Sequence, residues 1–198
     1  MAAPSPYSGT PVDPDDLIAF VPGVSLATMD EVYQAETVAI AAASEDLLLA
    51  IANHEIGDAD LTRPGTLEDI HEACFGSIWQ WAGILRQREL SIGVEPASLR
   101  QRLPEELGTI AWQIENETAS PEWIAMNAHH RLVYLHPFTD GNGRVTRLFA
   151  DALLFALTDG TRVFDWIEDV PTYLQALRAA DLSMSPQALL AVIGVREV

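Results

Sequence analysis

The spacing of hydrophobic residues predicts a mostly helical chain. Apolar side chains recur every three or four positions through most of the sequence, which is the period of an amphipathic helix. This pattern predicts helices over residues 29–52, 98–116, 121–135, 144–157 and 171–180, and a last helix that opens at Ser185 and Pro186. Thr66 is a good N-cap for one more helix, whose apolar stripe ends at Gly83. We therefore expect an all-α fold.

One short stretch departs from the helical period. Leu90, Ile92 and Val94 alternate with serine, glycine and glutamate. Such alternation is typical of a strand, because successive side chains of a strand point to opposite faces. The segment 86–96 is therefore expected to form a short strand or a small β-hairpin.

The length of 198 residues suits a single domain with a substantial core. Residues 1–16 contain four prolines and lack the charged and apolar regions of a signal peptide, so a flexible leader is expected before one domain over residues 17–198. The longest apolar runs are interrupted by polar residues and are too short to span a bilayer. The single cysteine, Cys74, excludes an internal disulfide, and the cytoplasm is the expected compartment.

The chain is strongly acidic, with 29 acidic residues, 11 basic residues and a formal net charge of -18. A surface of this charge repels nucleic acids and anionic membranes, so we expect neither as a partner and favour proteins or a metal-bound nucleotide. All eleven basic residues are arginine. The lack of lysine excludes a Walker A lysine and Schiff-base chemistry, because both need a lysine amine. A nucleotide site must therefore use arginine and backbone groups.

The groups best suited to chemistry are concentrated in one segment, His136-Pro-Phe-Thr-Asp-Gly-Asn-Gly-Arg-Val-Thr-Arg147. Pro137 disfavours a helical conformation at His136, so this imidazole is expected where a helix gives way to a loop. Gly141 and Gly143 allow backbone conformations that are closed to other residues. The helix predicted to follow points free N–H groups at the loop, which favours the binding of a phosphate.

Two arginines and one aspartate complete this candidate anion site. Arg144 and Arg147 are three residues apart, so they are expected on neighbouring turns of one helix face, where they can clamp one polyphosphate. Asp140 supplies a hard oxygen ligand, and Mg²⁺ commonly takes one or two carboxylates together with water and substrate phosphates. The alternative is a helix-capping loop with solvated arginines and a buried histidine.

The same segment matches, at every fixed position, the signature of the Fic family, His-x-Phe-x-(Asp/Glu)-Gly-Asn-Gly-Arg-x-x-Arg. The chain therefore resembles this family, which implies a helical bundle with a small β-hairpin flap. Phe75–Gly83 is similar to the family's segment upstream of the flap, and His129–Leu135 is similar to its central helix. Ala176–Asp181 is similar to the tail of a subgroup called mobile mystery protein B. The similarity to that subgroup extends from about Thr10 to near the C-terminus.

The resemblance implies transfer of AMP from ATP to a Ser, Thr or Tyr hydroxyl of a target protein, with release of pyrophosphate. It assigns His136 as the base, Asp140 as the Mg²⁺ ligand and Arg144 as the residue that neutralises the departing phosphates. The Gly141-Asn142-Gly143 backbone and the Asn142 amide are expected to hold the α- and β-phosphates.

Two further roles follow from the same resemblance. Arg147 is expected to contact the far end of the phosphate chain, because it lies further along the helix. Leu90, Ile92 and Val94 correspond to the flap, which pairs with an extended segment of the target and places its hydroxyl. An ordinary edge hairpin is the alternative for this segment.

Other functions stay open at this point. Relatives with an altered signature phosphorylate their targets, so a Doc-type phosphotransferase is one alternative, and a non-catalytic nucleotide-binding module is another. His129, His130 and His136 invite a zinc hydrolase, but no His-Glu-x-x-His spacing or cysteine pair completes a tetrahedral site. His54 and His71 have no partner at a diagnostic spacing and are expected to be ordinary histidines.

Many Fic proteins carry an inhibitory helix with the pattern (Ser/Thr)-x-x-x-Glu-(Gly/Asn), whose glutamate pairs with the second signature arginine. This chain has no full match. The nearest candidate is Glu36, which is expected to pair with Arg147, and Glu31 is a weaker alternative. A solvated glutamate on an amphipathic helix is the other interpretation of Glu36. Restraint by a separate antitoxin chain or by self-association would suit a toxin or a regulator.

Overall fold

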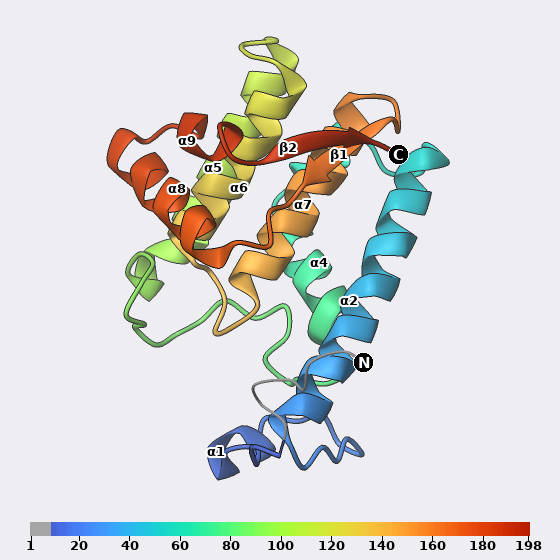
Figure 1. Ribbon diagram of the computed structural model, residues 1–198, viewed down its shortest axis with the longest axis vertical. Helices are drawn as coiled ribbons and strands as arrows, with labels where there is room; N and C mark the ends of the chain where they lie inside the picture. The colour runs from blue at the N-terminus through green and yellow to red at the C-terminus, as the bar shows by residue number, and fades with distance from the viewer. Residues whose placement is uncertain (1–8) are drawn as a thin grey trace.

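The chain folds into a bundle of helices with one small sheet (Figure 1). The structure is a computed structural model that describes residues 9–198. The helices are α1 (Pro14–Leu17), α2 (Met29–Ala52), α3 (Asp58–Leu61), α4 (Thr66–Phe75), α5 (Pro96–Glu115), α6 (Pro121–Leu135), α7 (Asn142–Leu157), α8 (Val170–Ser183) and α9 (Gln187–Leu190). Strands β1 (Arg162–Asp165) and β2 (Gly194–Glu197) pair antiparallel. The expected mostly helical fold is confirmed.

Helices α6 and α7 lie side by side at the centre of the bundle (Figure 1). All side chains of α6 from Ile124 to His130 are buried, and Phe149 and Leu153 of α7 are fully buried. Helix α5 packs against α6, while α2 and α4 pack against α7 and against each other. The loop that joins α6 to α7 is therefore held at both ends by helices that are packed into the core.

The helix ends follow the capping signals in the sequence. Ser120 caps α6 by accepting a hydrogen bond from the Trp123 N–H at 3.3 Å, and Pro121 occupies the first turn, as predicted. Helix α7 ends at Leu157, just before Asp159 and Gly160, which both adopt positive φ. Local signals therefore determine where the central pair of helices begins and ends.

The expected strand or hairpin over residues 86–96 does not form, so that prediction was wrong. These residues are irregular, and in residues 9–198 no strand lies beside them. Instead, the Val94 N–H donates to the carbonyl of Leu135 at the end of α6, at 3.3 Å. Gly93 adopts φ +92°, which interrupts the extended backbone that an alternating pattern requires. The segment is bound to a helix end and not to a strand.

Both ends of α4 differ from the sequence prediction. Gly65 is the N-cap of α4, and the helix begins at Thr66 itself. It ends at Phe75 and not at Gly83. After Phe75 the N–H groups of Ile78 and Trp79 donate to the same carbonyl, that of Phe75, so the regular helical ladder stops there. The residues after Phe75 therefore form turns, which bring the chain back towards α4.

The small sheet was not expected from the sequence, because each of its strands has only four residues. Arg162 pairs with Glu197, and Asp165 pairs with Gly194. Asp151 of α7 fixes the sheet to the bundle by accepting hydrogen bonds from the Phe164 N–H at 2.9 Å and from the Trp166 indole at 2.8 Å. Burial raises the pKa of Asp151 to about 6. The sheet thus closes the side of the bundle next to α7.

Part of the expected flexible leader is bound to the domain. The Val12 N–H donates to the Ala27 carbonyl at 3.1 Å, and the Met29 N–H donates to the Thr10 carbonyl at 2.9 Å. Val12 is 5% exposed. Residues 10–12 are thus joined to the segment before α2 and to its first residue, while the first eight residues of the expected leader lie outside the described part of the chain.

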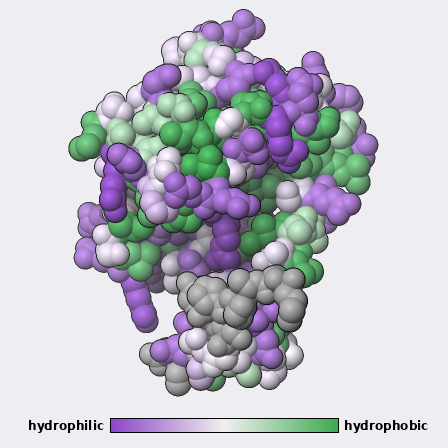
Figure 2. Space-filling model, in the orientation of Figure 1, coloured by the Kyte–Doolittle hydropathy of each residue, from purple (hydrophilic) through white to green (hydrophobic). Residues whose placement is uncertain are grey.

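The visible surface mixes hydrophilic and hydrophobic residues (Figure 2). Exposed apolar side chains such as Ile18, Val38 and Leu182 come from different segments, namely the turn after α1, helix α2 and helix α8. Among the helices of residues 9–198, none has the length and apolar character needed to cross a bilayer.

Truncating the core should show how much the central pair contributes to stability. Phe149→Ala removes a fully buried ring from α7 and is expected to lower the free energy of unfolding by about 3–5 kcal/mol. Leu182→Ala, at a side chain that is 90% exposed, is the control and should change it by less than about 0.5 kcal/mol. Urea unfolding followed by circular dichroism measures both. Equal values for the two variants would contradict this assignment of the core.

Candidate functional site

His136 begins the loop between α6 and α7 and ends α6. Its backbone is left-handed (φ 51°, ψ 60°), and its N–H group donates to the Leu132 carbonyl at 3.2 Å. Pro137 follows, so the helix cannot continue, as the sequence predicted. The imidazole is half-buried, and burial, together with the nearby Arg86, lowers the pKa of His136. The side chain is therefore neutral near pH 7 and able to accept a proton.

Asn142, the first residue of α7, closes this loop from within. Its side-chain amide donates to the Phe138 carbonyl at 2.8 Å and accepts from the Phe138 N–H at 2.9 Å. Both residues are buried, so water does not compete for these two bonds. These bonds use the amide oxygen and one of the two N–H groups of the side chain, and the expected contact of the Asn142 amide with phosphate stays a prediction. The Phe138 side chain is fully buried and so points into the core.

Gly141 packs directly against the α4 side chains Phe75 and His71. A Cβ atom at this position would come within 2.5 Å of the Phe75 ring and 3.3 Å of His71 Nε2. Gly141 also has φ +75°, a backbone conformation that favours glycine. Both the close approach and the backbone angle therefore require glycine here.

The first turn of α7 presents free donors to the loop. The N–H groups of Arg144 and Val145 both donate to the Gly141 carbonyl at 3.0 Å. The N–H groups of Asn142 and Gly143 precede the first intrahelical bonds and so have no acceptor within the helix. This end of α7 therefore has the polarity expected of an anion site.

Asp140 and Arg144 face each other at the mouth of the loop. Asp140 Oδ2 lies 3.3 Å from the Arg144 guanidinium, and 66% of the Asp140 side chain is exposed. A carboxylate with this exposure is accessible to a cation. It lies beside the N-terminus of α7, and its role as a metal ligand stays a prediction.

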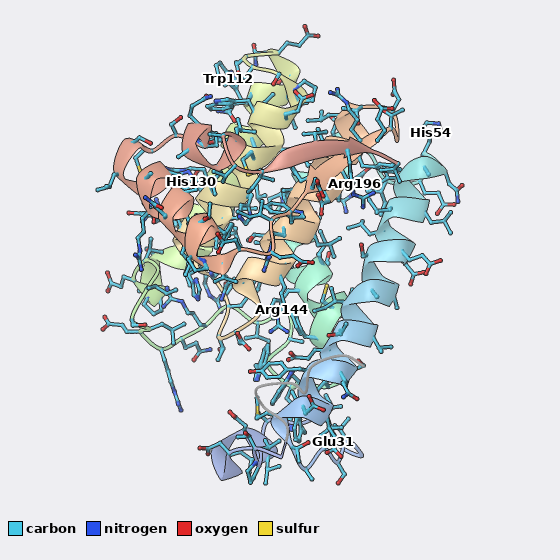
Figure 3. All side chains as sticks on the ribbon, viewed as in Figure 1. Glu31, His54, Trp112, His130, Arg144 and Arg196 are labelled. Carbon is cyan, nitrogen blue, oxygen red and sulfur yellow. The ribbon has the colours of Figure 1, made fainter. Side chains whose placement is uncertain are left out.

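Glu36 of α2 reaches Arg144 and not Arg147. Its Oε2 accepts a hydrogen bond from Arg144 at 2.5 Å, and its Oε1 accepts from the Trp79 indole at 2.7 Å. Glu36 is only 2% exposed. The expected pairing with Arg147 was therefore wrong, and so was the alternative of a solvated glutamate. Figure 3 places Arg144 near the lower end of α7, where α2 and α4 meet it.

Arg147 has other neighbours than Arg144, although three residues leave the two side chains only about 60° apart around the helix. Its Nε donates to the Gly143 carbonyl at 3.0 Å. Its guanidinium carbon lies 5.7 Å from the centroid of Tyr173 and 6.0 Å from that of Trp166. Arg144 instead lies 4.8 Å from the Phe75 centroid. The two arginines do not converge here, which corrects the expectation of a single clamp on one face.

Glu31, the weaker inhibitory candidate, caps α2. Its carboxylate accepts hydrogen bonds from the N–H groups of Ala27 at 2.7 Å and Thr28 at 3.1 Å. Figure 3 shows Glu31 near the N-terminal end of α2, well below Arg144. Glu31 is therefore a capping residue and makes no contact with this arginine.

Arg86 holds the expected flap segment against the loop. Its Nε donates to the His136 carbonyl at 2.6 Å, and its guanidinium also binds the Val94 carbonyl. Its backbone N–H donates to the Pro137 carbonyl at 2.9 Å. Gly93 comes so close that a Cβ atom there would lie 2.5 Å from His136 Cβ. The segment is therefore fastened next to His136 although it is not a strand.

The three apolar flap residues differ in exposure. Leu90 is 39% exposed and Ile92 is 60% exposed, while Val94 is partly buried. A cavity of about 480 Å³ opens between Ile92, His136, Gly143 and α8. A second cavity, of about 730 Å³, lies between α2, α3 and α4 and shares no lining residue with the first.

His129 and His130 do not join His136 in a metal site. His129 Nε2 contacts the Tyr173 hydroxyl at 2.9 Å, and His130 Nε2 contacts Asp181 Oδ1 at 3.0 Å (His130 is labelled in Figure 3). Burial lowers the pKa of His129 to about 3. Within residues 9–198, no group of three or more His, Cys, Asp or Glu side chains is arranged to hold a metal ion. The geometry therefore gives no support to a zinc hydrolase.

Three residues at the site were missed by the sequence interpretation. His71 was expected to be an ordinary histidine, and neither Arg86 nor Trp79 was given a role at the site. His71 is fully buried on α4, four residues before Phe75 and therefore on the same helix face. Its position on the apolar stripe of α4 was the one feature of the sequence that could have indicated a buried histidine. Nothing comparable marks Arg86, whose acceptors are backbone carbonyls from distant residues.

Residues 61–154 match the model of the Fic/DOC family, and this stretch contains the whole loop together with His71 and Arg86. The protein adenylyltransferase Fic of Nematostella vectensis is 53% identical over 38 residues, which cover 19% of this chain and 9% of that protein. Protein adenylyltransferase fic-1 of Caenorhabditis briggsae is 30% identical over 111 residues, which cover 54% of this chain and 21% of that protein. The chain therefore corresponds to a small part of these relatives.

A solved structure agrees with the fold. The BepC protein of Bartonella tribocorum with bound AMPPNP aligns over 86% of this chain and 91% of that chain, with a TM-score of 0.62 and 16% sequence identity. At this identity the likeness concerns the fold alone. Together with the family match and the geometry of the loop, it shows that the chain carries a Fic/DOC family domain over residues 61–154.

Proposed function

We propose that the chain is a protein adenylyltransferase, which moves AMP from ATP to a hydroxyl group of a target protein. The observation that carries the proposal is the order of groups along one loop. A neutral His136 stands at its start, the Asp140 carboxylate at its mouth and the N-terminus of α7 at its end. The names of the sequence relatives and the nucleotide analogue in a structural neighbour support the same reaction.

His136 serves as the general base. The hydroxyl oxygen of a Ser, Thr or Tyr side chain attacks the α-phosphorus of ATP, and His136 accepts the hydroxyl proton. A new oxygen–phosphorus bond forms, the bond from the α-phosphorus to the bridging oxygen breaks, and pyrophosphate leaves. The free N–H groups of Asn142 and Gly143 face the region where negative charge must be stabilised.

The residues at the loop mouth fit a hydrated magnesium ion better than a metal held by protein groups alone. Asp140 offers one exposed carboxylate. Mg²⁺ suits such a site because it keeps several waters and takes its other ligands from substrate phosphates. When bound, the ion would neutralise charge on the phosphates.

The cavity of about 480 Å³ beside His136 is the proposed place for the nucleoside. Tyr173, Leu174 and Leu177 of α8 give it an apolar wall, and Gly143 brings it to the start of α7. A base can bury its ring faces against such a wall while the phosphates extend towards the helix N-terminus. ATP is therefore the proposed co-substrate.

The flap segment is the proposed docking site for the target. Leu90 and Ile92 are exposed, and Arg86 fixes the segment beside His136. An extended peptide of the target could pair with its backbone and place a hydroxyl near the imidazole. The bond between the Val94 N–H and Leu135 leaves only the earlier part of the segment for such pairing.

A toxin or regulatory role is also proposed, with restraint built into the chain or supplied by an antitoxin or a second copy. The resemblance of residues 176–181 to mobile mystery protein B supports this role. Removal of Glu36, described below, separates restraint within the chain from restraint by another chain.

Labelling with ATP tests the reaction directly. The purified chain is incubated in a cell lysate with Mg²⁺ and either α-³²P-ATP or γ-³²P-ATP. Protein label from the α position alone supports AMP transfer. Label from the γ position alone would instead support a phosphotransferase. No label from either, with ATP binding retained, would leave a binding module, because turnover would be absent.

Removing the base should separate chemistry from binding. His136→Ala is expected to reduce AMP transfer by about 10²–10⁴-fold, because the hydroxyl loses its proton acceptor. ATP binding, measured by isothermal titration, should stay close to that of the unmodified chain. Asp140→Ala is the contrasting variant, in which the Mg²⁺ concentration at half-maximal ATP binding should rise, because the ion loses its proposed protein ligand. Retention of more than about half of the activity by His136→Ala would exclude His136 as the base.

Arg147 is predicted to contact the far end of the phosphate chain. It reaches back along α7 to Gly143, which also lines the cavity next to His136. Arg147→Ala should therefore reduce the preference for ATP over ADP, measured as the ratio of the two dissociation constants. An equal loss of affinity for both nucleotides would show that Arg147 acts only through packing on Tyr173 and Trp166.

The ion pair of Glu36 with Arg144 is predicted to restrain transfer, because it keeps this arginine from the phosphates. Glu36→Gly should raise the rate of AMP transfer well above that of the unmodified chain. Glu36→Gln keeps an acceptor for Trp79, removes the charge and should also raise the rate. Glu31→Gly removes a helix cap without touching Arg144 and should not. Unchanged or lower activity in folded Glu36 variants would point to restraint by a separate chain.

A further inference from the structure

His71 stands between the signature loop and the turn that follows α4. Its Nδ1 lies 2.9 Å from the Gly83 nitrogen, whose N–H donates to it. Its Nε2 lies 3.1 Å from the Asp140 carbonyl oxygen. Because a backbone N–H can only donate, Nδ1 carries no proton, and the neutral ring must carry its proton on Nε2. The Nε2–H group therefore donates to Asp140.

The surroundings of His71 keep it in this form. The residue has no exposed surface, and each of its ring nitrogens has a backbone partner, Gly83 on one side and Asp140 on the other. The ring also stacks on Phe138, with centroids 3.8 Å apart and planes 19° apart. The loop therefore rests on His71 through one hydrogen bond and one aromatic contact.

The contact between His71 and Asp140 involves only the Asp140 backbone, so His71 does not occupy the carboxylate, which faces Arg144. The Asp140 side chain is 66% exposed and points to the mouth of the loop. The next residue, Gly141, lies 3.3 Å from His71 Nε2 at the position of its missing Cβ. The peptide between Asp140 and Gly141 is thus oriented by His71, while Asn142 and Phe138 close the loop on its other side.

We infer that His71 is a positioning residue for the proposed transfer, because it orients the Asp140–Gly141 peptide and so aims the Asp140 carboxylate and the start of α7 at a Mg²⁺-bound phosphate chain. This role rests on the proposed function. A histidine that only filled space in the core would need neither a defined tautomer nor a bond to this carbonyl. Residues that hydrogen-bond to a metal ligand without touching the metal commonly contribute about 10–100-fold to metal affinity or activity.

Three substitutions separate positioning from packing. His71→Phe keeps an aromatic ring against Phe138 and removes both hydrogen bonds. The amide of glutamine places a donor near the position of Nε2, and that of asparagine places an acceptor near the position of Nδ1. His71→Gln should therefore restore the bond to Asp140, whereas His71→Asn should restore only the bond from Gly83.

The measurement is ATP binding by isothermal titration over a series of Mg²⁺ concentrations, with circular dichroism to confirm folding. For His71→Phe, the Mg²⁺ concentration at half-maximal binding should rise about 10–100-fold, in line with losses at comparable supporting residues. His71→Asn should show a similar rise, and His71→Gln should lie close to the unmodified chain. If His71→Phe does not fold, the difference in this Mg²⁺ concentration between His71→Gln and His71→Asn still tests the positioning role.

Equal Mg²⁺ requirements in His71→Gln and His71→Asn would overturn the positioning role, and so would a His71→Phe protein with an unchanged requirement. Neither result would affect the proposed transfer, because the unmodified chain would still bind Mg²⁺ and ATP. A lack of ATP binding by the unmodified chain would instead refute the proposed function, and the positioning role with it. The binding readout therefore distinguishes the two failures without measuring transfer.

Discussion

The reciprocal hydrogen bonds between the Asn142 amide and the backbone of Phe138 are the constraint on which the site depends. Six residues must reverse the chain between α6 and α7. Leaving a buried donor or acceptor unpaired costs about 1–3 kcal/mol, so the loop is strongly held in the one shape that satisfies both bonds. That shape sends Phe138 inward, leaves the Asp140 carboxylate outside and starts α7 where its free N–H groups face the loop.

A second contact decides how the positive charge of the site is distributed. Arg144 is shared between the buried carboxylate of Glu36 and the exposed carboxylate of Asp140, and it also lies over Phe75. Trp79 holds Glu36 in place from the other side. A phosphate that binds Arg144 must therefore displace a carboxylate that is already desolvated and hydrogen-bonded. Arg147 is oriented towards Tyr173 and Trp166, so the two arginines meet different neighbours before any ligand arrives.

Local features of the fold could be predicted from the sequence, and long-range contacts could not. The predicted boundaries at residues 121, 135 and 157 are those of the structure, because capping residues, prolines and glycines act over a few residues. The alternation at Leu90, Ile92 and Val94 gave the wrong structure, because a strand needs a partner and this segment is bound to the end of α6 instead. The strands β1 and β2 were missed because four residues carry too little pattern.

The same distinction holds for the site. His136, Asp140 and the glycines could be found because the signature is continuous in sequence. His71, Arg86 and Trp79 reach the loop from other segments, and only the fold brings them there. The choice of Arg144 over Arg147 as the partner of Glu36 depends on the rotation of α7 against α2, which the residue pattern of either helix leaves open.

Mass spectrometry of proteins from cells that express the chain tests the central claim most directly. The comparison includes the unmodified chain, Glu36→Gly and the double variant Glu36→Gly with His136→Ala. We expect AMP adducts on side-chain hydroxyl groups of a target protein, more of them with Glu36→Gly and none with the double variant. Adducts of equal abundance in the double variant, or phosphate in place of AMP, would contradict this expectation.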